Sequence, residues 1–198
     1  GNRYFKTMDD TEIFVEGFPA PPTLVLIGGG HVNRAVSRWA SFLGFRMYAV
    51  DDRVEFANKE RFPEAETLVI SDYSRGLENV SVNSNTYIVV ATRGHRYDDL
   101  ALAAAIRTPA RYIGLLGSKR KTLEIYKNLL KEKVPPERLR EVYAPIGLNI
   151  GAITPEELAV SIMAEIIMVR NGGTGMSMKM NTANLNTLMK HEEPDQAL

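Results

Sequence analysis

Residues 24–52 contain a glycine-rich turn between an apolar run and a helical pattern, and this segment constrains the fold more than any other part of the chain. The apolar run ends in Gly28, Gly29 and Gly30. The helical pattern that follows leads to a second apolar run, which ends in Asp51. A strand, a glycine turn, a helix, a second strand and an acidic residue form the layout of a dinucleotide-binding βαβ unit. The segment therefore predicts a nucleotide-type ligand held at the turn.

The residues of this turn have separate physical roles in the predicted site. Gly28 lets the chain turn sharply, and Gly30 leaves no Cβ atom between the backbone and a pyrophosphate. His31 and Val32 begin a helix whose unpaired amide groups and positive dipole end favour an anion. Asp51 lies 23 positions after Gly28, about the spacing expected of a residue that binds a ribose hydroxyl.

The turn departs from the usual pattern at its third glycine position, which is Asn33. A glycine there normally allows a close approach of helix and strand, so we expect Asn33 to push the helix outward and to loosen phosphate binding. The alternative is a doubly wound domain that keeps the turn for packing and has no ligand.

The rest of the chain alternates predicted strands and helices. Strands are expected at 23–27, 45–50, 67–70, 86–91, 111–115 and 141–143, and helices at about 31–43, 98–106, 118–133 and 154–170. This alternation predicts an α/β fold of the Rossmann-like type, a doubly wound, mostly parallel sheet with helices on both faces. In the strand order 3-2-1-4-5-6, ligands bind beyond the carboxyl ends of the strands, near the switch between the first and fourth strands.

Composition bounds the domain organisation and the class of function. In the 198 residues we expect an N-terminal lead-in at 1–20 with an edge strand at 11–18 and a proline-rich spacer, a nucleotide-binding domain at 21–170 and a flexible tail at 171–198. The 24 basic and 24 acidic residues balance, which favours neither a nucleic-acid nor a membrane partner. Cysteine is absent and no apolar stretch is long enough to cross a bilayer, so a cytoplasmic location is the simplest expectation.

Five polar or glycine-rich loops follow the predicted strands, and a parallel sheet places all of them at one edge. After the glycine turn they are 50–53, 92–98, 117–121 and 144–152. The candidate ligand-binding residues in these loops are Gly28, Gly29, Gly30, His31, Val32, Asn33, Asp51, Asp52, Arg53, Thr92, Arg93, Gly94, His95, Gly117, Ser118, Lys119 and Arg120. Loops of this kind gathered at one edge are typical of a binding cleft.

The loop 92–98, with the sequence TRGHRYD, lies beside the predicted switch point. We interpret it as a site for an anionic or heteroaromatic ligand, with His95 as a candidate acid–base catalyst. The alternative is an ordinary loop between a strand and a helix, with Asp98 near the helix cap.

The loop 117–121, with the sequence GSKRK, predicts a helix N-cap at Ser118 followed by three cations. Cations are unfavourable at a helix N-terminus, and an anionic ligand would offset that cost. Ser118, Lys119 and Arg120 are therefore a second candidate phosphate site, whereas Lys121 is expected to face solvent.

The acidic tip of the second strand leaves the choice of dinucleotide open. Asp51 and Asp52 favour an unphosphorylated ribose, whereas an arginine in the position of Arg53 is able to accept a 2′-phosphate. Paired carboxylates also suit a metal ion, but the histidines lack the spacing of metal ligands, so no metal site is expected.

Five sequence blocks, in this order, resemble the C-terminal domain of the xanthine dehydrogenase accessory factor (XdhC/CoxI) family. They are LIGGGHVNRAV, YAVDDRVEFANKERFPEA, VVATRGHRYDDLAL, YIGLLGSKRK and APIGLNIGAITPEELAVSIMAEII, and they span about residues 21–170. The resemblance implies a Rossmann fold and a role in maturing molybdenum hydroxylases such as xanthine dehydrogenase. The family's N-terminal domain, with a cysteine implicated in cofactor handling, has no counterpart in this sequence. We therefore expect a C-terminal fragment or a relative that works with a partner.

The ligand that the resemblance implies is the molybdenum cofactor, as a mononucleotide or a dinucleotide, and NAD(P) is the alternative. The cofactor is a phosphorylated pterin, so a phosphate cradle suits either form. An accessory or chaperone protein with a molybdenum hydroxylase apoenzyme as its partner, with a homodimer left open, is favoured over a stand-alone enzyme. The alternatives are an NAD(P)-dependent oxidoreductase that uses His95 and a nucleotide-sensing regulatory domain.

Overall fold

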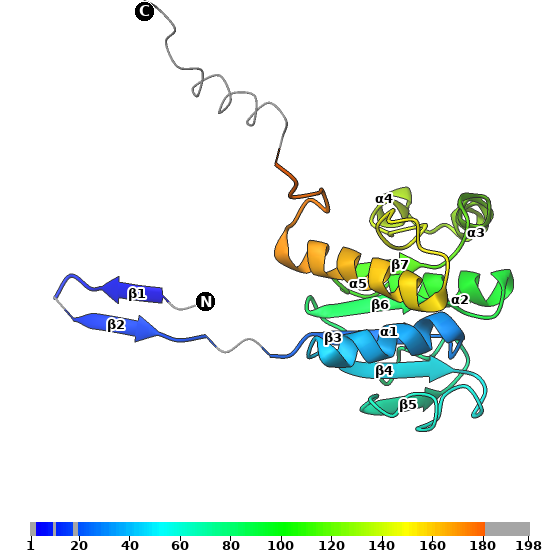
Figure 1. Ribbon diagram of the computed structural model, residues 1–198, viewed down its shortest axis with the longest axis horizontal. Coiled ribbons are helices and arrows are strands. Elements are labelled where there is room, and N and C mark those ends of the chain that lie inside the picture. Colours follow the sequence, from blue (N-terminus) through cyan, green and yellow to red (C-terminus); the bar gives the residue numbers. More distant parts are fainter. Residues whose placement is uncertain (1–2, 10, 18–19, 181–198) are drawn as a thin grey trace, which may run out of the picture.

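The structure is a computed structural model that describes residues 3–9, 11–17 and 20–180 (Figure 1). Its centre is a parallel sheet of β3 (Thr23–Ile27), β4 (Arg46–Asp51), β5 (Thr67–Ile70), β6 (Thr86–Val90) and β7 (Tyr112–Leu115). The strand order is β5-β4-β3-β6-β7, and every neighbouring pair is parallel. The predicted doubly wound α/β fold is confirmed, with the switch point between β3 and β6.

The predicted sixth strand at 141–143 is reduced to a single residue. Tyr143 makes one parallel bridge to β7, in which its amide donates to the carbonyl oxygen of Ile113 (2.9 Å) and its own carbonyl oxygen accepts from Leu115 (2.9 Å). Pro145 follows two residues later and has no amide hydrogen, so the ladder does not extend into a strand.

The described residues form the helices α1 (His31–Phe42), α2 (His95–Ile106), α3 (Lys119–Lys131), α4 (Pro136–Arg140) and α5 (Pro155–Asn171). α2 begins three residues before the predicted start at 98, directly after Gly94 as its N-cap. α4 was not predicted, because its five residues are too few for a helical period to show in the sequence.

Alternate residues of each strand face the two helical layers. Val25 and Ile27 pack in the core with α2 and α3, whereas Leu24 and Leu26 pack with α1 and α5. All four side chains are buried. α1 and α5 lie side by side over one face of the sheet (Figure 1). Because helices cover both faces, a ligand reaches the sheet only beyond the strand ends.

The N-terminal segment forms a separate hairpin of β1 (Arg3–Lys6) and β2 (Glu12–Val15). A strand was expected at 11–18 as a sheet edge, and β2 instead pairs with β1, apart from the five-stranded sheet (Figure 1). Of the predicted tail, residues 181–198 lie outside the described residues. Within the described part of the chain, no helix has the length and apolar character needed to cross a membrane.

Candidate functional site

The glycine turn between β3 and α1 lies at the carboxyl end of the sheet, beside the switch point. Gly28 has a φ of +103°, a conformation that L side chains rarely adopt. A Cβ atom at Gly28 would lie 2.2 Å from the carbonyl oxygen of Ala91, and the Gly28 amide donates to the carbonyl oxygen of Val50 (2.7 Å). Gly28 is therefore required both by the turn and by its packing against the ends of two neighbouring strands.

Gly29 is enclosed by the segment that follows β4. Its amide donates to Asp51 Oδ2 (2.7 Å), and its carbonyl oxygen accepts from Arg61 Nε (3.2 Å) and Nη2 (3.0 Å). A Cβ atom at Gly29 would lie 2.2 Å from the carbonyl oxygen of Phe56. Both polar groups of Gly29 are thus used within the protein.

Gly30 is the open position of the turn. A Cβ atom there would meet nothing within 4 Å, and its φ of −71° and ψ of 179° are accessible to any residue. As the N-cap of α1 it has no side chain to bind the helix amides, and the first turn of α1 has no acidic residue. Among the described residues, the amides of Gly30, His31 and Val32 have no hydrogen-bond acceptor. Unpaired donors at an open helix N-terminus suit an anion.

Asn33 has a role that we did not predict from the sequence. Its side chain is fully buried, and Nδ2 donates to the carbonyl oxygens of Ile27 (3.1 Å) and Gly28 (2.7 Å). We expected Asn33 to push the helix outward, but it instead ties the first turn of α1 to the end of β3. The signal lay in the residue type, because an amide side chain supplies a donor that a glycine lacks.

Asp51, at the end of β4, is 1% exposed and accepts hydrogen bonds from two residues. Besides the Gly29 amide, its donors are the Arg53 amide (3.1 Å), Nε (2.9 Å) and Nη2 (3.3 Å). Burial alone would raise the pKa of Asp51, but the hydrogen bonds from Arg53 and Gly29 lower it below its ordinary value. Burial and the charge of Asp51 raise the pKa of Tyr73, so the tyrosine keeps its proton. The predicted ribose-binding role of Asp51 stays a prediction. A ribose hydroxyl would compete with these donors for the Asp51 carboxylate.

Asp52 and two arginines connect the loops that follow β4 and β6. Arg93 Nη2 donates to Asp52 Oδ2 (2.6 Å), and Arg53 Nε lies 3.5 Å from Asp52 Oδ1. The Arg93 guanidinium lies over the ring of Tyr97, 4.4 Å from its centroid, and the Arg53 guanidinium lies 3.6 Å from the centroid of Phe56. Three predicted site residues are thus brought together near the switch point, where Asp52 pairs with both arginines.

A buried ion pair joins α2 to α3. Asp98 Oδ1 accepts from the amide (3.1 Å) and the hydroxyl (2.7 Å) of Thr92, and Asp98 Oδ2 pairs with Lys121 Nζ. The expectation that Lys121 faces solvent is therefore wrong, because a buried carboxylate on another helix draws its ammonium group inward. Sequence reasoning missed this pair, since its two residues lie on different helices and no local pattern connects them.

The predicted residues before and within α3 form a capped helix start. Ser118 Oγ accepts from the Lys121 amide (3.2 Å), which confirms the predicted N-cap. Lys119 and Arg120 are exposed beside this cap, and Gly117 precedes it. Their contact with a phosphate stays a prediction.

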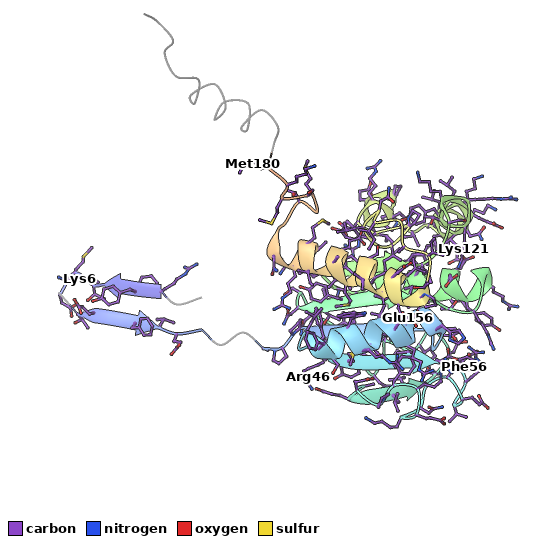
Figure 2. All side chains as sticks on the ribbon, viewed as in Figure 1. Lys6, Arg46, Phe56, Lys121, Glu156 and Met180 are labelled. Carbon is purple, nitrogen blue, oxygen red and sulfur yellow. The ribbon has the colours of Figure 1, made fainter. Side chains whose placement is uncertain are left out.

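The two predicted histidines lie at helix starts at the same end of the sheet. His31 is exposed and lines a hollow of about 90 Å³ between the starts of α1 and α5, together with Arg34, Pro155 and Glu156. Figure 2 shows Glu156, Lys121 and Phe56 at this end of the sheet and Arg46 at the other. The side chain of His95 lies outside the described residues, so its catalytic role stays a prediction.

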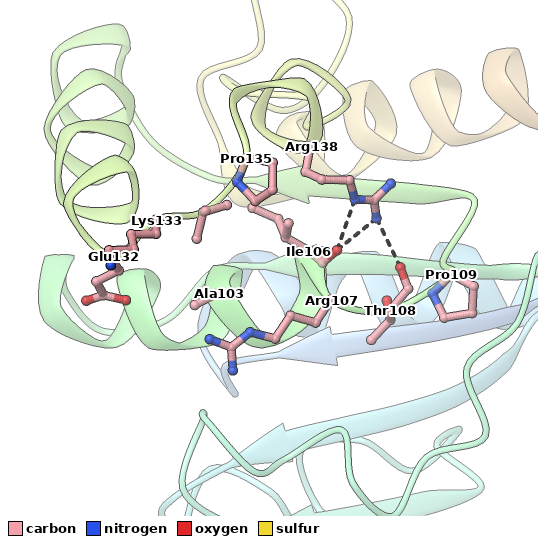
Figure 3. A pocket seen from close by; sticks show the side chains of 10 residues that line it. Ala103, Ile106, Arg107, Thr108, Pro109, Glu132, Lys133, Pro135 and Arg138 are labelled. Atoms are coloured by element: carbon pink, nitrogen blue, oxygen red, sulfur yellow. Dashed lines mark hydrogen bonds between the residues drawn. The ribbon is translucent and has the colours of Figure 1, made fainter.

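A separate cavity of about 600 Å³ lies at the opposite end of α2 (Figure 3). Its lining includes Arg107, Lys133 and Arg138. Arg138 donates to the carbonyl oxygens of Ile106 (2.8 and 3.2 Å) and Thr108 (3.1 Å), so it pairs carbonyl groups at the C-terminal end of α2. No predicted site residue lines this cavity and Arg138 is committed to the fold, so we place the candidate site at the glycine turn.

Known proteins match the chain over the domain that contains this turn. The sequence model of the XdhC Rossmann domain matches residues 24–166. The chain belongs to the XdhC Rossmann domain family. The matched span runs from β3 into α5 and includes the glycine turn and the loops after β4, β6 and β7. The resemblance predicted from the five sequence blocks is thereby confirmed.

Two curated relatives and one solved structure are similar to this XdhC domain. An uncharacterized protein of Escherichia coli (strain K12), YqeB, is 37% identical over 164 residues, which are 82% of this chain and 30% of that protein. A probable xanthine dehydrogenase subunit of Bacillus subtilis (strain 168) is 34% identical over 160 residues, 81% of this chain and 46% of that protein. A crystal structure of a xanthine dehydrogenase from Bacillus halodurans is 28% identical with a TM-score of 0.68, and covers 80% of this chain and 45% of that chain. The chain spans less than half the length of each of them.

Proposed function

We propose that this XdhC domain binds the molybdenum cofactor, as a mononucleotide or a dinucleotide, and takes part in its insertion into a xanthine dehydrogenase-type molybdenum hydroxylase. The family and the names of two relatives support an accessory role connected with xanthine dehydrogenase. In this proposal the domain is a carrier, the apoenzyme is its partner, and the cofactor is cargo whose redox chemistry serves the partner.

The observation that carries the proposal is the open position at Gly30. The unpaired amides of Gly30, His31 and Val32 supply donors and partial positive charge, and the absent Cβ leaves room for phosphate oxygens. Gly28 and Gly29, by contrast, are filled by contacts within the protein. The terminal phosphate of a pterin, or the pyrophosphate of its dinucleotide form, is an anion that fits this cradle.

Basic side chains at the same edge add to the attraction for an anion. Lys119 and Arg120 are exposed at the start of α3, whose first turn has no acidic residue. Arg34 and Arg38 lie on α1. Together these cations raise the local concentration of an anionic ligand and its rate of association.

Titration of the purified domain with the molybdenum cofactor, followed by pterin fluorescence, tests the proposal. Gly30→Leu should weaken binding at least tenfold, because its side chain fills the space over the amides without backbone strain. Gly173→Leu is the matched control, since Gly173 is exposed beyond α5 and should leave binding unchanged. Absence of saturable binding to the wild type, or equal binding by the two variants, contradicts the proposal.

A second measurement tests the partner. The cofactor-loaded wild type should form a complex with the apo form of a xanthine dehydrogenase-type hydroxylase and raise its activity. Gly30→Leu should fail to activate it in proportion to its loss of cofactor. Full activation by Gly30→Leu would overturn the carrier mechanism.

A thermal-shift panel of NADH, NADPH, FAD, CTP and CDP separates the carrier from a dinucleotide-dependent enzyme. A ligand present at a hundredfold its Kd stabilises the folded state by about 2.7 kcal/mol. We expect no such stabilisation by NADH or NADPH, and turnover of either with a small carbonyl compound would favour an oxidoreductase.

A further inference from the structure

An adenosine nucleotide in a βαβ site needs two features besides the phosphate cradle. It needs room between the glycine turn and the segment after the second strand, and it needs a free carboxylate at that strand end to accept from the ribose hydroxyls. Gly29 and Asp51 occupy these two positions here. The surroundings of these two residues therefore decide whether an adenosine is bound in the usual way.

The carboxylate of Asp51 is already fully used. Oδ2 accepts from the Gly29 amide and Arg53 Nη2, and Oδ1 accepts from the Arg53 amide and Nε. A carboxylate has about four acceptor directions, so none is left for a ribose hydroxyl. Displacing Arg53 would also break its ion pair with Asp52 and its contact with the ring of Phe56.

The room beside Gly29 is also filled. The carbonyl oxygen of Phe56 lies 2.2 Å from the position that a Cβ atom of Gly29 would take, and the Arg61 guanidinium binds the Gly29 carbonyl oxygen. Arg61 in turn lies 4.8 Å from the centroid of the Phe56 ring. The backbone of Gly29 therefore lies against the backbone of Phe56 on the β4 side of the turn, whereas a Cβ atom at Gly30 would meet nothing within 4 Å.

We infer that the segment 53–61 closes the ribose side of this cleft and that Arg53 determines its specificity. Arg53 and the Gly29 amide hold Asp51 in place, so the adenosine part of a nucleotide gains no contact with Asp51 and adds no affinity over a compact phosphate-bearing ligand. The inference rests on the proposed function, because it concerns the ligand of the same cradle. The phosphate lies over Gly30, and the organic part of the ligand lies on the α1–α5 side of the turn, away from β4.

ADP and methyl diphosphate are a matched pair of probes, because they carry the same charged diphosphate ester and differ in the adenosine. Each is titrated into the wild-type protein, with the amide resonance of Gly30 followed by NMR. We expect both to shift this resonance with Kd values within threefold of each other. ADP binding at least tenfold tighter, with the preference lost in Asp51→Asn, overturns the inference but leaves the phosphate cradle in place.

The Arg53→Ala variant tests the residue itself. The variant removes the Nε and Nη2 donors and so frees two acceptor directions of Asp51, and the affinity for ADP should rise at least fivefold relative to that for methyl diphosphate. Arg46→Ala, which removes an exposed arginine at the start of β4 that pairs with Glu66, should leave the ratio of the two Kd values unchanged. Arg53→Lys keeps the charge without the paired guanidinium donors, and should give the same direction of change if Arg53→Ala does not fold.

The outcomes separate the two proposals. An unchanged ratio in a folded Arg53 variant overturns the role of Arg53. If neither probe shifts the Gly30 amide in the wild type, the phosphate cradle of the proposed function fails and this inference fails with it.

Discussion

α1 and α5 begin side by side at the carboxyl end of the sheet (Figure 1). The two helices differ in whether the backbone amides at their N-termini have hydrogen-bond partners. At α5, Thr154 Oγ1 accepts from the Glu157 amide (3.2 Å), and Glu157 Oε2 accepts from the amides of Ile153 (2.7 Å) and Thr154 (3.0 Å). The two bonds between Thr154 and Glu157 form a capping box, and the bonds from the Ile153 and Thr154 amides lower the pKa of Glu157. At α1 the N-cap is Gly30, which supplies no side chain. The amides of Thr154 and Glu157 at the start of α5 are thus paired within the protein, whereas the amides of Gly30, His31 and Val32 at α1 have no acceptor among the described residues.

The contrast indicates which helix start is structural and which is available for binding. The same chain encodes a complete cap for α5, so an uncapped α1 is a local property of its sequence rather than of the fold. A glycine at the N-cap costs only a few tenths of a kcal/mol relative to serine or aspartate. Gly30 therefore keeps the donors of α1 accessible with little loss of stability.

The largest effect on stability should come from placing a side chain at Gly28, the packed end of the glycine turn, rather than at Gly30, its open end. Gly28→Ala should destabilise the fold by about 3 kcal/mol or more, because it combines an unfavourable φ with a clash against the backbone of Ala91. Gly30→Ala should change the free energy of unfolding by less than about 0.5 kcal/mol. Urea denaturation of both variants checks this, and similar losses would contradict the division of the turn into a packed and an open part.

Asp51→Asn should give the next largest loss, roughly 2 kcal/mol, since hydrogen bonds to a charged group contribute about 1.5–3 kcal/mol. Glu66→Gln is the control, because its ion pair with Arg46 is half exposed and should contribute less than about 0.5 kcal/mol. The measurement is again the free energy of unfolding in urea. Equal effects of the two substitutions would show that Asp51 does not lock the turn.

The difference in stability between the wild type and Asp51→Asn should depend on pH. The pKa of folded Asp51 lies below that of an unfolded aspartate, which is about 3.9. Its contribution to stability is therefore complete above that value and is lost as the pH falls through the folded pKa. Acidification below about pH 4 should narrow the stability gap between wild type and Asp51→Asn, and a gap that widens would contradict the assigned hydrogen bonds.

Most of the sheet could be predicted because each strand is a short apolar run followed by a polar or glycine-rich loop. β5 has the bounds expected from its residues, Thr67–Ile70, and the cap Ser118 was predicted from residue type and position. Tyr143 could not be distinguished from a full strand, because the sequence does not show how far a ladder extends beyond one bridge.

The candidate site could be predicted as a place but not as a set of contacts. Parallel topology brings the loops to one edge whatever residues they contain. The pairing of Asp98 with Lys121 and the packing of Phe56 against Gly29 depend on distances between separate elements, for which the sequence has no local signal. The distinction between a closed and an open glycine therefore required the structure.

Removing the cap of α5 tests the other half of the comparison. Thr154→Ala should cost about 1 kcal/mol of stability and leave anion binding unchanged, because the Glu157 carboxylate stays bound to the amides of residues 153 and 154 and repels an anion there. Urea denaturation and titration with methyl diphosphate measure the two effects. A loss of binding as large as that in Gly30→Leu would mean that both helix starts form one anion site.

Giving α1 a cap of its own should have the smallest effect on stability and a large effect on binding. Gly30→Asp places a carboxylate over the unpaired amides, so it should stabilise the free protein by a few tenths of a kcal/mol. The same carboxylate occupies the donors and repels an anion, so methyl diphosphate binding should be lost. Gly30→Asn is the matched neutral control, and it should bind more weakly than the wild type but more tightly than Gly30→Asp. Wild-type affinity in Gly30→Asp would show that the ligand does not use the amides of α1, and the contrast with α5 would then have no bearing on function.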